Sequence, residues 1–252
     1  MERYLQQMEP IALADMKAVQ LMNRVDQKYL TNTDTLPHLL QMIASNYFVQ
    51  RIDGIAVSDY RTLYFDTPEL AMYTCHHNRK LHRQKLRIRT YRSTLTTFFE
   101  LKDKNNKGRT RKTRIRLPHT LFDNPLQSVE VAQFVQENTP FKVSNLAPQV
   151  ENSFQRITLV DKGMHERVTI DYNIRFLNRH TSLEYNIPRL VIIEVKHEVG
   201  APASAIEQSL QQLHIHHKRV SKYCLGTILT NPQAKYNRFK SKLRAIERIL
   251  EN

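Results

Sequence analysis

Basic side chains recur at every second position in several short segments of the chain. In the segment KLRIR, Lys85, Arg87 and Arg89 alternate with apolar residues. Because side chains on a β-strand point alternately to its two faces, this spacing predicts a strand with one cationic and one apolar face. Arg and Lys together on one surface suit phosphate binding, since Arg grips phosphate with a planar fork and Lys supplies a point charge.

The same alternation continues along the chain. Its polar positions are Glu100, Lys102 and Lys104, then Lys112, Arg114 and Arg116, then Arg167, Thr169, Asp171, Asn173 and Arg175, and finally Glu194 and Lys196. An antiparallel sheet with its polar face in water explains any one of these strands. It explains the set poorly, because like charges opposite one another on neighbouring strands destabilise a sheet. A polyanion between the strands removes this difficulty, and we therefore expect the sheet to close around a basic tunnel.

Acidic residues also occur on the cationic faces. Glu100 and Glu194 each precede a lysine by two positions, and Asp171 lies among polar residues of another strand. Mg²⁺ and Mn²⁺ commonly take one or two carboxylates together with phosphate oxygens and water. A few acids inside a basic cavity are therefore expected for a metal–triphosphate complex. The alternative is that Glu100 and Glu194 only neutralise the neighbouring lysines.

The composition favours a polyanionic partner. Lys and Arg total 38 and Asp and Glu total 24, so the net charge is 38 − 24 = +14. The partner can be nucleic acid, an anionic membrane surface or a phosphorylated small molecule. The sequence contains neither GxxxxGK[ST] nor GxGxxG, which argues against a P-loop or Rossmann site. It also lacks a helix-turn-helix, zinc-finger or RNP signature, so specific nucleic-acid recognition is not expected.

The expected compartment is the cytoplasm. Cys75 and Cys224 are the two cysteines and form no CxxC motif, so a disulfide framework is not expected. The N-terminus lacks the continuous apolar block of a signal peptide. We also expect no membrane helix, because no apolar run approaches the roughly 18–20 residues that one requires.

The overall pattern predicts an α+β fold: a closed antiparallel β-barrel tunnel with a basic interior, flanked by N- and C-terminal helices. We expect residues 1–252 to form one domain, with barrel strands mainly in 47–200 and flanking helices in about 1–46 and 201–252. The apolar spacing predicts helices over residues 1–25, from Thr33 or Asp34 through Ile43, near 128–137, over 205–213 and over 233–250. The apolar faces of the strands are expected to pack on the terminal helices.

Nine short motifs resemble the VTC (vacuolar transporter chaperone) domain family of polyphosphate polymerases, which belongs to the triphosphate tunnel metalloenzymes. They are RVDQKYL (24–30), YRTLYFDT (60–67), KLRIRTY (85–91), FELKDK (99–104), RKTR (111–114), FQRITL (154–159), RVTIDYN (167–173), IIEVK (192–196) and SKYCLG (221–226). The resemblance covers roughly residues 18 to 230. It implies a closed antiparallel tunnel in which ATP donates a phosphoryl group to a polyphosphate chain, with Mn²⁺ or Mg²⁺ as cofactor.

The resemblance also implies roles for individual residues. Arg87 and Arg89 resemble the triphosphate ligands, Glu194 the metal-binding glutamate, and Lys222 the lysine near the reacting phosphates. Further phosphate contacts are implied for Lys28, Lys102, Lys112, Arg156, Arg167 and Lys196, with Arg61 and Arg114 as additional lining residues. The implied catalytic set is therefore Lys222, Arg87, Arg89 and Glu194.

The sequence departs from relatives of this family in two respects. It lacks the N-terminal ExExK signature of the adenylate cyclase and thiamine triphosphatase branch. It also lacks the phosphate-sensing domain and membrane segments of the eukaryotic complex subunits, so coupling to translocation requires a separate membrane protein partner. Two alternatives to a polymerase stay open: a metal-dependent tripolyphosphatase or nucleoside triphosphatase, and a non-catalytic module that binds polyanions.

Three further features have simpler interpretations. The histidines of HIHHK, His214, His216 and His217, are expected in a solvated loop rather than at a metal. Cys224 is expected to be a small buried residue, because no base is arranged beside it. The basic C-terminal helix is expected to pack on the domain with a wet outer face rather than on a membrane.

Overall fold

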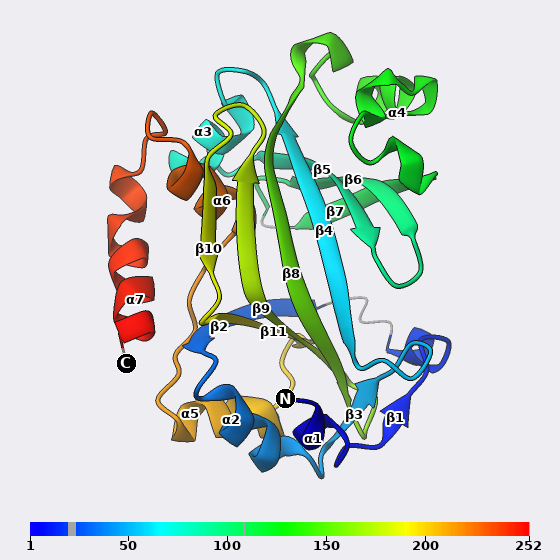
Figure 1. Cartoon of the computed structure of the whole chain (residues 1–252), viewed down its shortest axis with the longest axis vertical. Helices are drawn as coiled ribbons and strands as arrows, with labels where there is room; N and C mark the ends of the chain where they lie inside the picture. The colour runs from blue at the N-terminus through cyan, green and yellow to red at the C-terminus, as the bar shows by residue number, and fades with distance from the viewer. Residues whose placement is uncertain (20–23, 108, 252) are drawn as a thin grey trace.

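The computed structural model describes residues 1–19, 24–107 and 109–251 and has an α+β architecture (Figure 1). An 11-stranded sheet, antiparallel apart from the β1–β3 pair, forms its centre. The strands are β1 (Pro10–Ile11), β2 (Arg24–Asn32), β3 (Tyr47–Gln50), β4 (Val57–Asp66), β5 (Arg83–Tyr91), β6 (Thr96–Lys104), β7 (Thr110–Leu117), β8 (Ala147–Asp161), β9 (Glu166–Asn178), β10 (Glu184–Ile187) and β11 (Leu190–Glu198).

The main path of the sheet runs β2-β11-β9-β8-β4-β5-β6-β7. Its two ends, β2 and β7, make no hydrogen-bonded pair with each other in the described parts of the chain. The sheet is nevertheless strongly curved, and β5, β6 and β7 turn away from the direction of β8 and β9 (Figure 1). Hydrogen bonding therefore confirms a large antiparallel sheet and does not show the expected closed barrel.

Helices border the sheet at both ends (Figure 1). They are α1 (Glu2–Leu5), α2 (Leu36–Ile43), α3 (Ala71–His77), α4 (Val129–Asn138), α5 (Ala205–Gln212), α6 (Lys222–Thr230) and α7 (Lys240–Glu251). Short 3-10 turns lie at Asp15–Ala18, His119–Leu121, Pro125–Gln127, Val143–Asn145 and Asn237–Phe239. The predicted helices through Ile43, near 128–137 and over 205–213 are confirmed as α2, α4 and α5.

One apolar core lies between α2, α5 and the outer side of β8, β9 and β11. Leu39 and Leu40 of α2 and Ile206 of α5 pack with strand residues such as Ile170 and Ile193, all of them fully buried. These strand residues alternate with the polar positions noted in the sequence. Their burial fixes which face of each strand is turned outward, because a slip of one residue would exchange the two faces.

Further cores lie under α4 and under α6 and α7. Phe134 of α4 packs edge-to-face on Phe99 of β6, with ring centroids 5.8 Å apart. Leu225 of α6 and Ile246 of α7 belong to a third core, which also contains Leu30 of β2 and Ile192 of β11. Terminal helices therefore cover the sheet, but not only on the expected apolar faces, because Leu30 and Ile192 share the faces of Lys28 and Glu194 on their strands.

Two sequence predictions of helix are corrected at the chain ends. Residues 1–25 do not form one helix: α1 ends at Leu5, and Pro10–Ile11 and Arg24 onward are strands. Pro10 supports this outcome, since its missing N–H disfavours a helix interior, while residues 20–23 lie outside the described part. Region 1–46 thus contributes an edge strand to the sheet. The C-terminal helix begins at Lys240 rather than near residue 233, after a 3-10 turn.

Candidate functional site

Cross-strand register brings the predicted basic positions onto one face of the sheet. Lys28 lies opposite Glu194, and Lys196 opposite Arg167, while Arg156 lies opposite Asp171. Directly opposed residues share a face, and we call this face the inner face. The alternation in the sequence therefore predicted these positions correctly. On β9 it is wrong for Arg175, which lies opposite Ser153 beyond a register shift and is turned to the other face.

Glu194 forms the centre of one cluster on the inner face. Its Oε1 lies 2.8 Å from the Lys28 ammonium, and its Oε2 lies 3.0 Å from that of Lys196. Burial alone would raise the pKa of Glu194, but the charges of Lys196 and Lys28 outweigh it and hold the pKa well below its ordinary value. Burial lowers the pKa of Lys196 to about 8, with Glu194 acting against this shift. Glu194 is therefore a carboxylate held ionised between two cations.

Asp171 forms the centre of a second cluster. It receives hydrogen bonds from Arg156 through Nε at 2.5 Å and Nη2 at 2.7 Å, and it also pairs with the Lys222 ammonium. Asp171 is 3% exposed. Burial would raise its pKa, but Arg156 and Lys222 reverse the direction and lower it. This buried carboxylate fixes two cations from different elements, β8 and α6.

The first turn of α6 is held in place by several contacts, and this fixes Lys222. Ser221 caps the helix by accepting a hydrogen bond from the Cys224 backbone N–H at 3.4 Å. Tyr223 donates to Asp66, a fully buried carboxylate that also accepts two N–H bonds from the start of α3. A Cβ at Gly226 would lie 2.5 Å from Phe176 Cδ1, so glycine permits the close approach of α6 to the sheet.

Glu100 forms the centre of a third cluster, on β5, β6 and β7. It lies 2.7 Å from Arg87 Nη2, 4.0 Å from Arg89 Nη2 and 2.5 Å from Lys112 Nζ. Burial alone would raise its pKa, but these three cations lower it to about 2. Glu100 therefore neutralises neighbouring cations, as in the simpler of the two sequence interpretations.

Arg114 and Arg167 complete the predicted inner-face set. Arg114 lies opposite Glu100 in the register of β6 and β7, and its guanidinium lies 4.4 Å from the centroid of the Phe98 ring. Arg167 is half-buried and lies opposite Lys196. Both residues therefore belong to strands that present cations to the same side of the sheet.

Three lysines form a direct row across neighbouring strands. Lys85 of β5 pairs in register with Lys102 of β6, which pairs in turn with Lys112 of β7. Like charges in directly opposite positions destabilise a sheet. The Lys85 ammonium donates to Ser221 Oγ at 3.0 Å, which is a neutral partner. Lys112 already has Glu100 as a counter-ion, whereas Lys85 and Lys102 form no ion pair among the described residues. An anion lying against these two lysines would reduce the repulsion.

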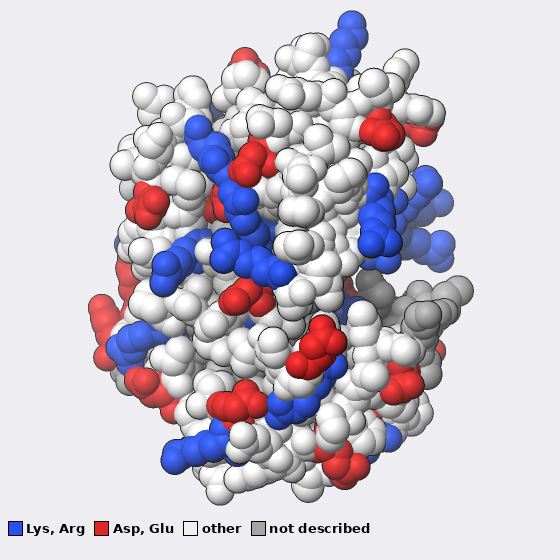
Figure 2. Space-filling model, turned by 45° about the vertical axis from the view of Figure 1, so that its right-hand side comes forward, with Lys and Arg blue, Asp and Glu red and all other residues white. Residues whose placement is uncertain are grey.

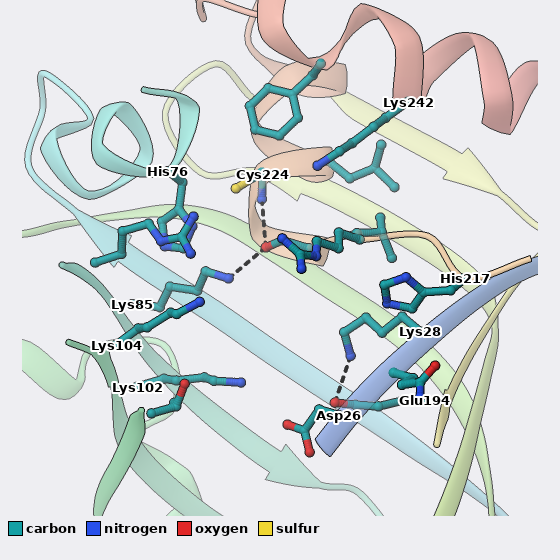
Figure 3. Close-up of a pocket in the computed structure, with 18 of the residues that line it drawn as sticks. Asp26, Lys28, His76, Lys85, Lys102, Lys104, Glu194, His217, Cys224 and Lys242 are labelled. Carbon is teal, nitrogen blue, oxygen red and sulfur yellow. Dashed lines mark hydrogen bonds and ion pairs between the residues drawn. The ribbon is translucent and has the colours of Figure 1, made fainter. Parts of the chain in front are cut away.

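A cavity of about 560 Å³ opens on this face (Figure 3). Of the predicted site residues, Lys28, Lys102 and Glu194 line it. The remaining cations of its wall are Arg83, Lys85, Lys104, Arg219 and Lys242. Figure 3 shows lysine side chains from several strands and from α7 directed into the same space. The other predicted residues lie on inner-face strands or α6 but are not part of this wall.

Several residues of the cavity wall were not predicted as site residues. Asp26 precedes Lys28 by two positions on β2, so strand alternation alone could have indicated it. His76, Cys224 and Lys242 come from helices whose placement depends on packing, and no local signal identifies them. Cys224 is 3% exposed, which confirms the prediction of a buried residue. His214, His216 and His217 are exposed, and His217 also lines the cavity.

Arg61 is the prediction that the structure corrects. It lies opposite Ser153 on β8 and Thr90 on β5, whereas its neighbours Tyr60 and Thr62 share the inner face with Arg89. Its guanidinium pairs with Glu151 and lies 2.9 Å from Asp123. Arg61 therefore belongs to an ion-pair network on the outer face and does not line the cavity.

The acidic residues on the inner face can be examined as possible ligands of a divalent metal. Within the described ranges, no group of three or more His, Cys, Asp or Glu side chains is arranged to hold one. The cavity wall includes two carboxylates, Asp26 and Glu194, and Glu194 is held ionised. Two oxygen donors suit a hard cation that takes its other ligands from phosphate and water. The residues therefore fit a metal that arrives with a phosphorylated ligand.

The surface charge is not evenly spread. On the face seen in Figure 2, broad uncharged areas separate groups of Lys and Arg, and several of these groups adjoin Asp or Glu.

Among the helices in the described residues, none is both long enough and apolar enough to cross a bilayer.

The fold resembles that of solved structures of low sequence identity. A candidate adenylate cyclase from Bacillus halodurans aligns with a TM-score of 0.50 and 16% identity, covering 86% of this chain and 97% of that one. A candidate adenylyl cyclase from Hippeastrum, described as having a dominant triphosphatase activity, aligns with a TM-score of 0.50 and 13% identity, covering 83% and 97%. A comparison with curated proteins returns no significant match.

These similarities show a shared fold. The model of the VTC domain family matches residues 23–231. The chain belongs to the VTC domain family, as the nine motifs indicated, and its match excludes the last helix, α7.

Proposed function

We propose that this protein is an ATP-dependent polyphosphate polymerase. In this proposal, the γ-phosphoryl group of ATP passes to a chain of inorganic polyphosphate held along the inner face, with Mn²⁺ or Mg²⁺ as cofactor. The family and the fold support phosphate-polymer or triphosphate chemistry in general. The choice of a polymerase rests on the family together with the extent of the cationic surface.

The observation that carries the proposal is the row Lys85, Lys102 and Lys112. Direct opposition of like charges is unfavourable in a sheet, and of the three lysines Lys112 alone has a counter-ion, Glu100, among the described residues. A phosphate polymer offers one negative charge per unit and can lie across three strands, so it matches a row better than a single phosphate group does. An extended polyanion bound across the three strands would thus offset the repulsion within the row.

The proposal includes a tunnel, although hydrogen bonds do not close the sheet. The cavity wall contains Asp26 and Lys28 of one terminal strand, β2, and Thr110 of the other, β7. Lys102 of β6 is also close enough to Glu194 of β11 to interact electrostatically. Both ends of the sheet therefore border one space, as in a tunnel that closes through side chains. We treat residues 1–252 as one domain, because α7 also borders that space.

Glu194, with Asp26 beside it on the neighbouring strand, would hold the divalent metal. A bound metal would neutralise charge on phosphate oxygens during transfer. Both oxygens of Glu194 pair with lysines in the described structure. Metal binding would therefore draw an oxygen away from Lys28 or Lys196 and leave that ammonium group available to phosphate.

The cations of the chain itself would bind and orient the reacting groups. Arg87 and Arg89 are positioned by Glu100, and Arg156 and Lys222 by Asp171. Guanidinium groups fixed in this way can stabilise charge on the equatorial phosphoryl oxygens without first reorganising. Burial lowers the pKa of Lys222, with Asp171 opposing the shift. Lys222 would therefore hold its proton through the ion pair and present it to the reacting phosphates.

A metal-dependent tripolyphosphatase or nucleoside triphosphatase is the second candidate. The Hippeastrum protein, whose fold is similar, is described as a triphosphatase. Such an enzyme would use the same cations and metal with water as acceptor.

The partners are the same in both proposals. Neither includes specific binding of nucleic acid, and a membrane protein partner would be required only if the product were moved across a membrane. We place the reaction in the cytoplasm, since both cysteines are free thiols.

The two candidates differ in their products. Purified protein would be incubated with ATP and Mn²⁺, and the products separated on a gel that resolves polyphosphate lengths. A ladder in wild type that is absent in Glu194→Gln supports the polymerase. Glu198→Gln is the matched control, because Glu198 is an exposed glutamate at the end of the same strand. Orthophosphate without a ladder would instead support hydrolysis.

A further inference from the structure

The wall of the cavity is divided by chemical character. Most of the charged residues come from the strands, including Lys28, Lys85, Lys102 and Glu194, whereas most residues from α6 and α7 are apolar, with Lys242 of α7 as an exception. The apolar members at the helical end are Leu225 and Ile228 of α6, Leu243 and Ile246 of α7, and Phe239 of the turn before α7. Figure 3 places Lys242 and Cys224 at one end of the cavity and Asp26 and Glu194 at the other. The cavity therefore has an apolar end and an ionic end.

The segment that forms much of the apolar end lies outside the matched family region. The VTC match ends at residue 231, whereas Phe239, Lys242, Leu243 and Ile246 follow it. Ile246 is 5% exposed and packs in the core with Leu225, so α7 is a fixed part of the fold. The family resemblance therefore does not account for this part of the site.

Phe239 and Lys242 are arranged together at that end. The Phe239 ring stacks on Tyr73, with centroids 6.2 Å apart, and the Lys242 ammonium lies 5.1 Å from the centroid of Phe239. Packing on Tyr73 holds the aromatic ring in place, while Lys242 reaches from α7 toward Cys224 (Figure 3). An aromatic ring and a nearby cation are suited to a flat heteroaromatic group that also carries hydrogen-bond acceptors.

We propose that the segment from Phe239 to Ile246 is a binding site for the nucleoside of the phosphoryl donor, so that α7 sets the preference for a nucleotide over inorganic phosphate donors. This inference rests on the proposed function, because it assumes that the donor's triphosphate lies against the cationic strands. The base packs on Phe239 and its aliphatic neighbours, and Lys242 donates to an acceptor atom of the nucleoside.

His76 adds a neutral polar group to the same region. Burial and the nearby charges of Lys85 and Arg83 lower its pKa to about 2, so it is uncharged at neutral pH. Its Nε2 is buried and has no hydrogen-bond partner within the described part of the chain. A neutral imidazole is compatible with a nucleoside, whereas another cation would favour a further phosphate group.

A polyphosphate chain alone does not explain this end of the cavity. Polyphosphate has no apolar surface, and contact with five apolar side chains would remove its water without compensation. A nucleoside triphosphate has both characters in one molecule, and a cavity of about 560 Å³ is within the range of sites for ligands of this size.

The test compares two ligands that differ in the nucleoside. Binding of ATP and of inorganic tripolyphosphate would be measured by calorimetry for wild type, Phe239→Ala and Lys242→Ala. We expect the ATP dissociation constant to rise about tenfold in Phe239→Ala, as for loss of one stacked base. Tripolyphosphate binding should stay within about twofold of wild type. Arg244→Ala is the matched control, because Arg244 is exposed on α7 and outside the cavity wall.

The remaining outcomes are distinct. If a variant weakens the binding of ATP and of tripolyphosphate equally, or leaves ATP binding unchanged, the nucleoside site is overturned. The proposed phosphate site is not contradicted by either result. Failure of wild type to bind either ligand overturns the proposed function together with this inference. Because Phe239 packs on Tyr73, Phe239→Leu serves as a second variant that keeps an apolar side chain. The exposed Lys242 can be changed with little risk to folding.

Discussion

Arg156 and Asp171 lie opposite each other on β8 and β9 and form a two-point ion pair, with Nε–Oδ1 and Nη2–Oδ2 distances of 2.5 and 2.7 Å. Lys222 of α6 pairs with the same carboxylate. One buried acid therefore carries two cations, and this local excess of positive charge leaves room for an anionic ligand to add favourable interactions.

Removing the Asp171 charge should make stability depend on phosphate. In Asp171→Asn, Arg156 and Lys222 lose their counter-charge, and the free energy of unfolding should fall by about 3 kcal/mol. Urea denaturation would measure this loss. Tripolyphosphate should restore more stability to the variant than it adds to wild type, because the ligand supplies the missing negative charge.

The control for this experiment is Asp34→Asn. Asp34 pairs with Arg189 at 2.7 Å, but its side chain is 68% exposed. Loss of such a surface pair should cost less than about 1 kcal/mol. An equal gain from tripolyphosphate in Asp171→Asn and wild type would contradict a phosphate site beside Asp171.

Glu100 should make stability decrease in acid. Its pKa is lowered from 4.5 to about 2 by Arg87, Arg89 and Lys112, which outweigh burial. A group with a lowered folded-state pKa stabilises the protein fully above its unfolded pKa and loses this contribution as pH falls through the folded pKa. The contribution, about 3 kcal/mol, should therefore be complete above about pH 4.5 and disappear toward pH 2.

The measurement is the difference in unfolding free energy between wild type and Glu100→Gln across this range. The difference should be constant from about pH 5 to 7 and shrink below about pH 4.5. A difference that stays constant down to pH 2.5 would show that the Glu100 carboxylate gains nothing from its cationic neighbours.

Lys102 should contribute to polyphosphate binding but not to the stability of the fold. It stands in register between Lys85 and Lys112. Lys102→Gln removes the central charge of the row, so the free energy of unfolding should stay equal or rise by up to about 1 kcal/mol. Polyphosphate binding should weaken about tenfold, as expected for the loss of one charged hydrogen bond.

Lys107→Gln provides the comparison, since Lys107 is exposed in the turn between β6 and β7. It should change neither quantity by much. A Lys102→Gln variant that is strongly destabilised, with polyphosphate binding unaltered, would mean that the row serves the fold and not a ligand.

Arg61 should affect stability without affecting phosphate binding. It pairs with the largely buried Glu151 on the outer face. Arg61→Met leaves that carboxylate with fewer partners and should lower the free energy of unfolding by about 2 kcal/mol. Calorimetric titration with polyphosphate should give the wild-type dissociation constant. A raised dissociation constant, with the same free energy of unfolding as wild type, would place Arg61 in the phosphate site.

Alternation within strands allowed much of the inner face to be predicted. Lys85, Arg87 and Arg89 share a face with the positions that the sequence indicated on β6, because a period of two leaves little freedom once the opposite face is apolar. On β9 the rule fails at Arg175, which lies opposite Ser153 on the outer face, because the register shifts between Ser153 and Gln155. Arg61 was predicted as a lining residue through the family motif but lies on the outer face, because its strand, β4, inverts this rule. Its inner-face positions include Tyr60 and Tyr64, which look like core residues, while Arg61 shares a face with Leu63.

The rest of the site could not be predicted from local patterns. Lys28 was identified through the family motif, although it lies in the region 1–46 in which flanking helices were expected and its segment is a strand. His76 and Lys242 reach the cavity from α3 and α7, which are far apart in the chain. Their approach depends on packing, such as that of Ile246 on Leu225, which no residue spacing specifies.

The most direct test of the account follows the label from ATP. Protein and Mn²⁺ would be incubated with ATP labelled at the γ-phosphorus or, separately, at the α-phosphorus, and the polymer fraction counted. The account predicts γ-label in polyphosphate and no α-label, because only the terminal phosphoryl group is transferred. Label from the γ-position found only in orthophosphate, or α-label in the polymer, would contradict a polyphosphate polymerase.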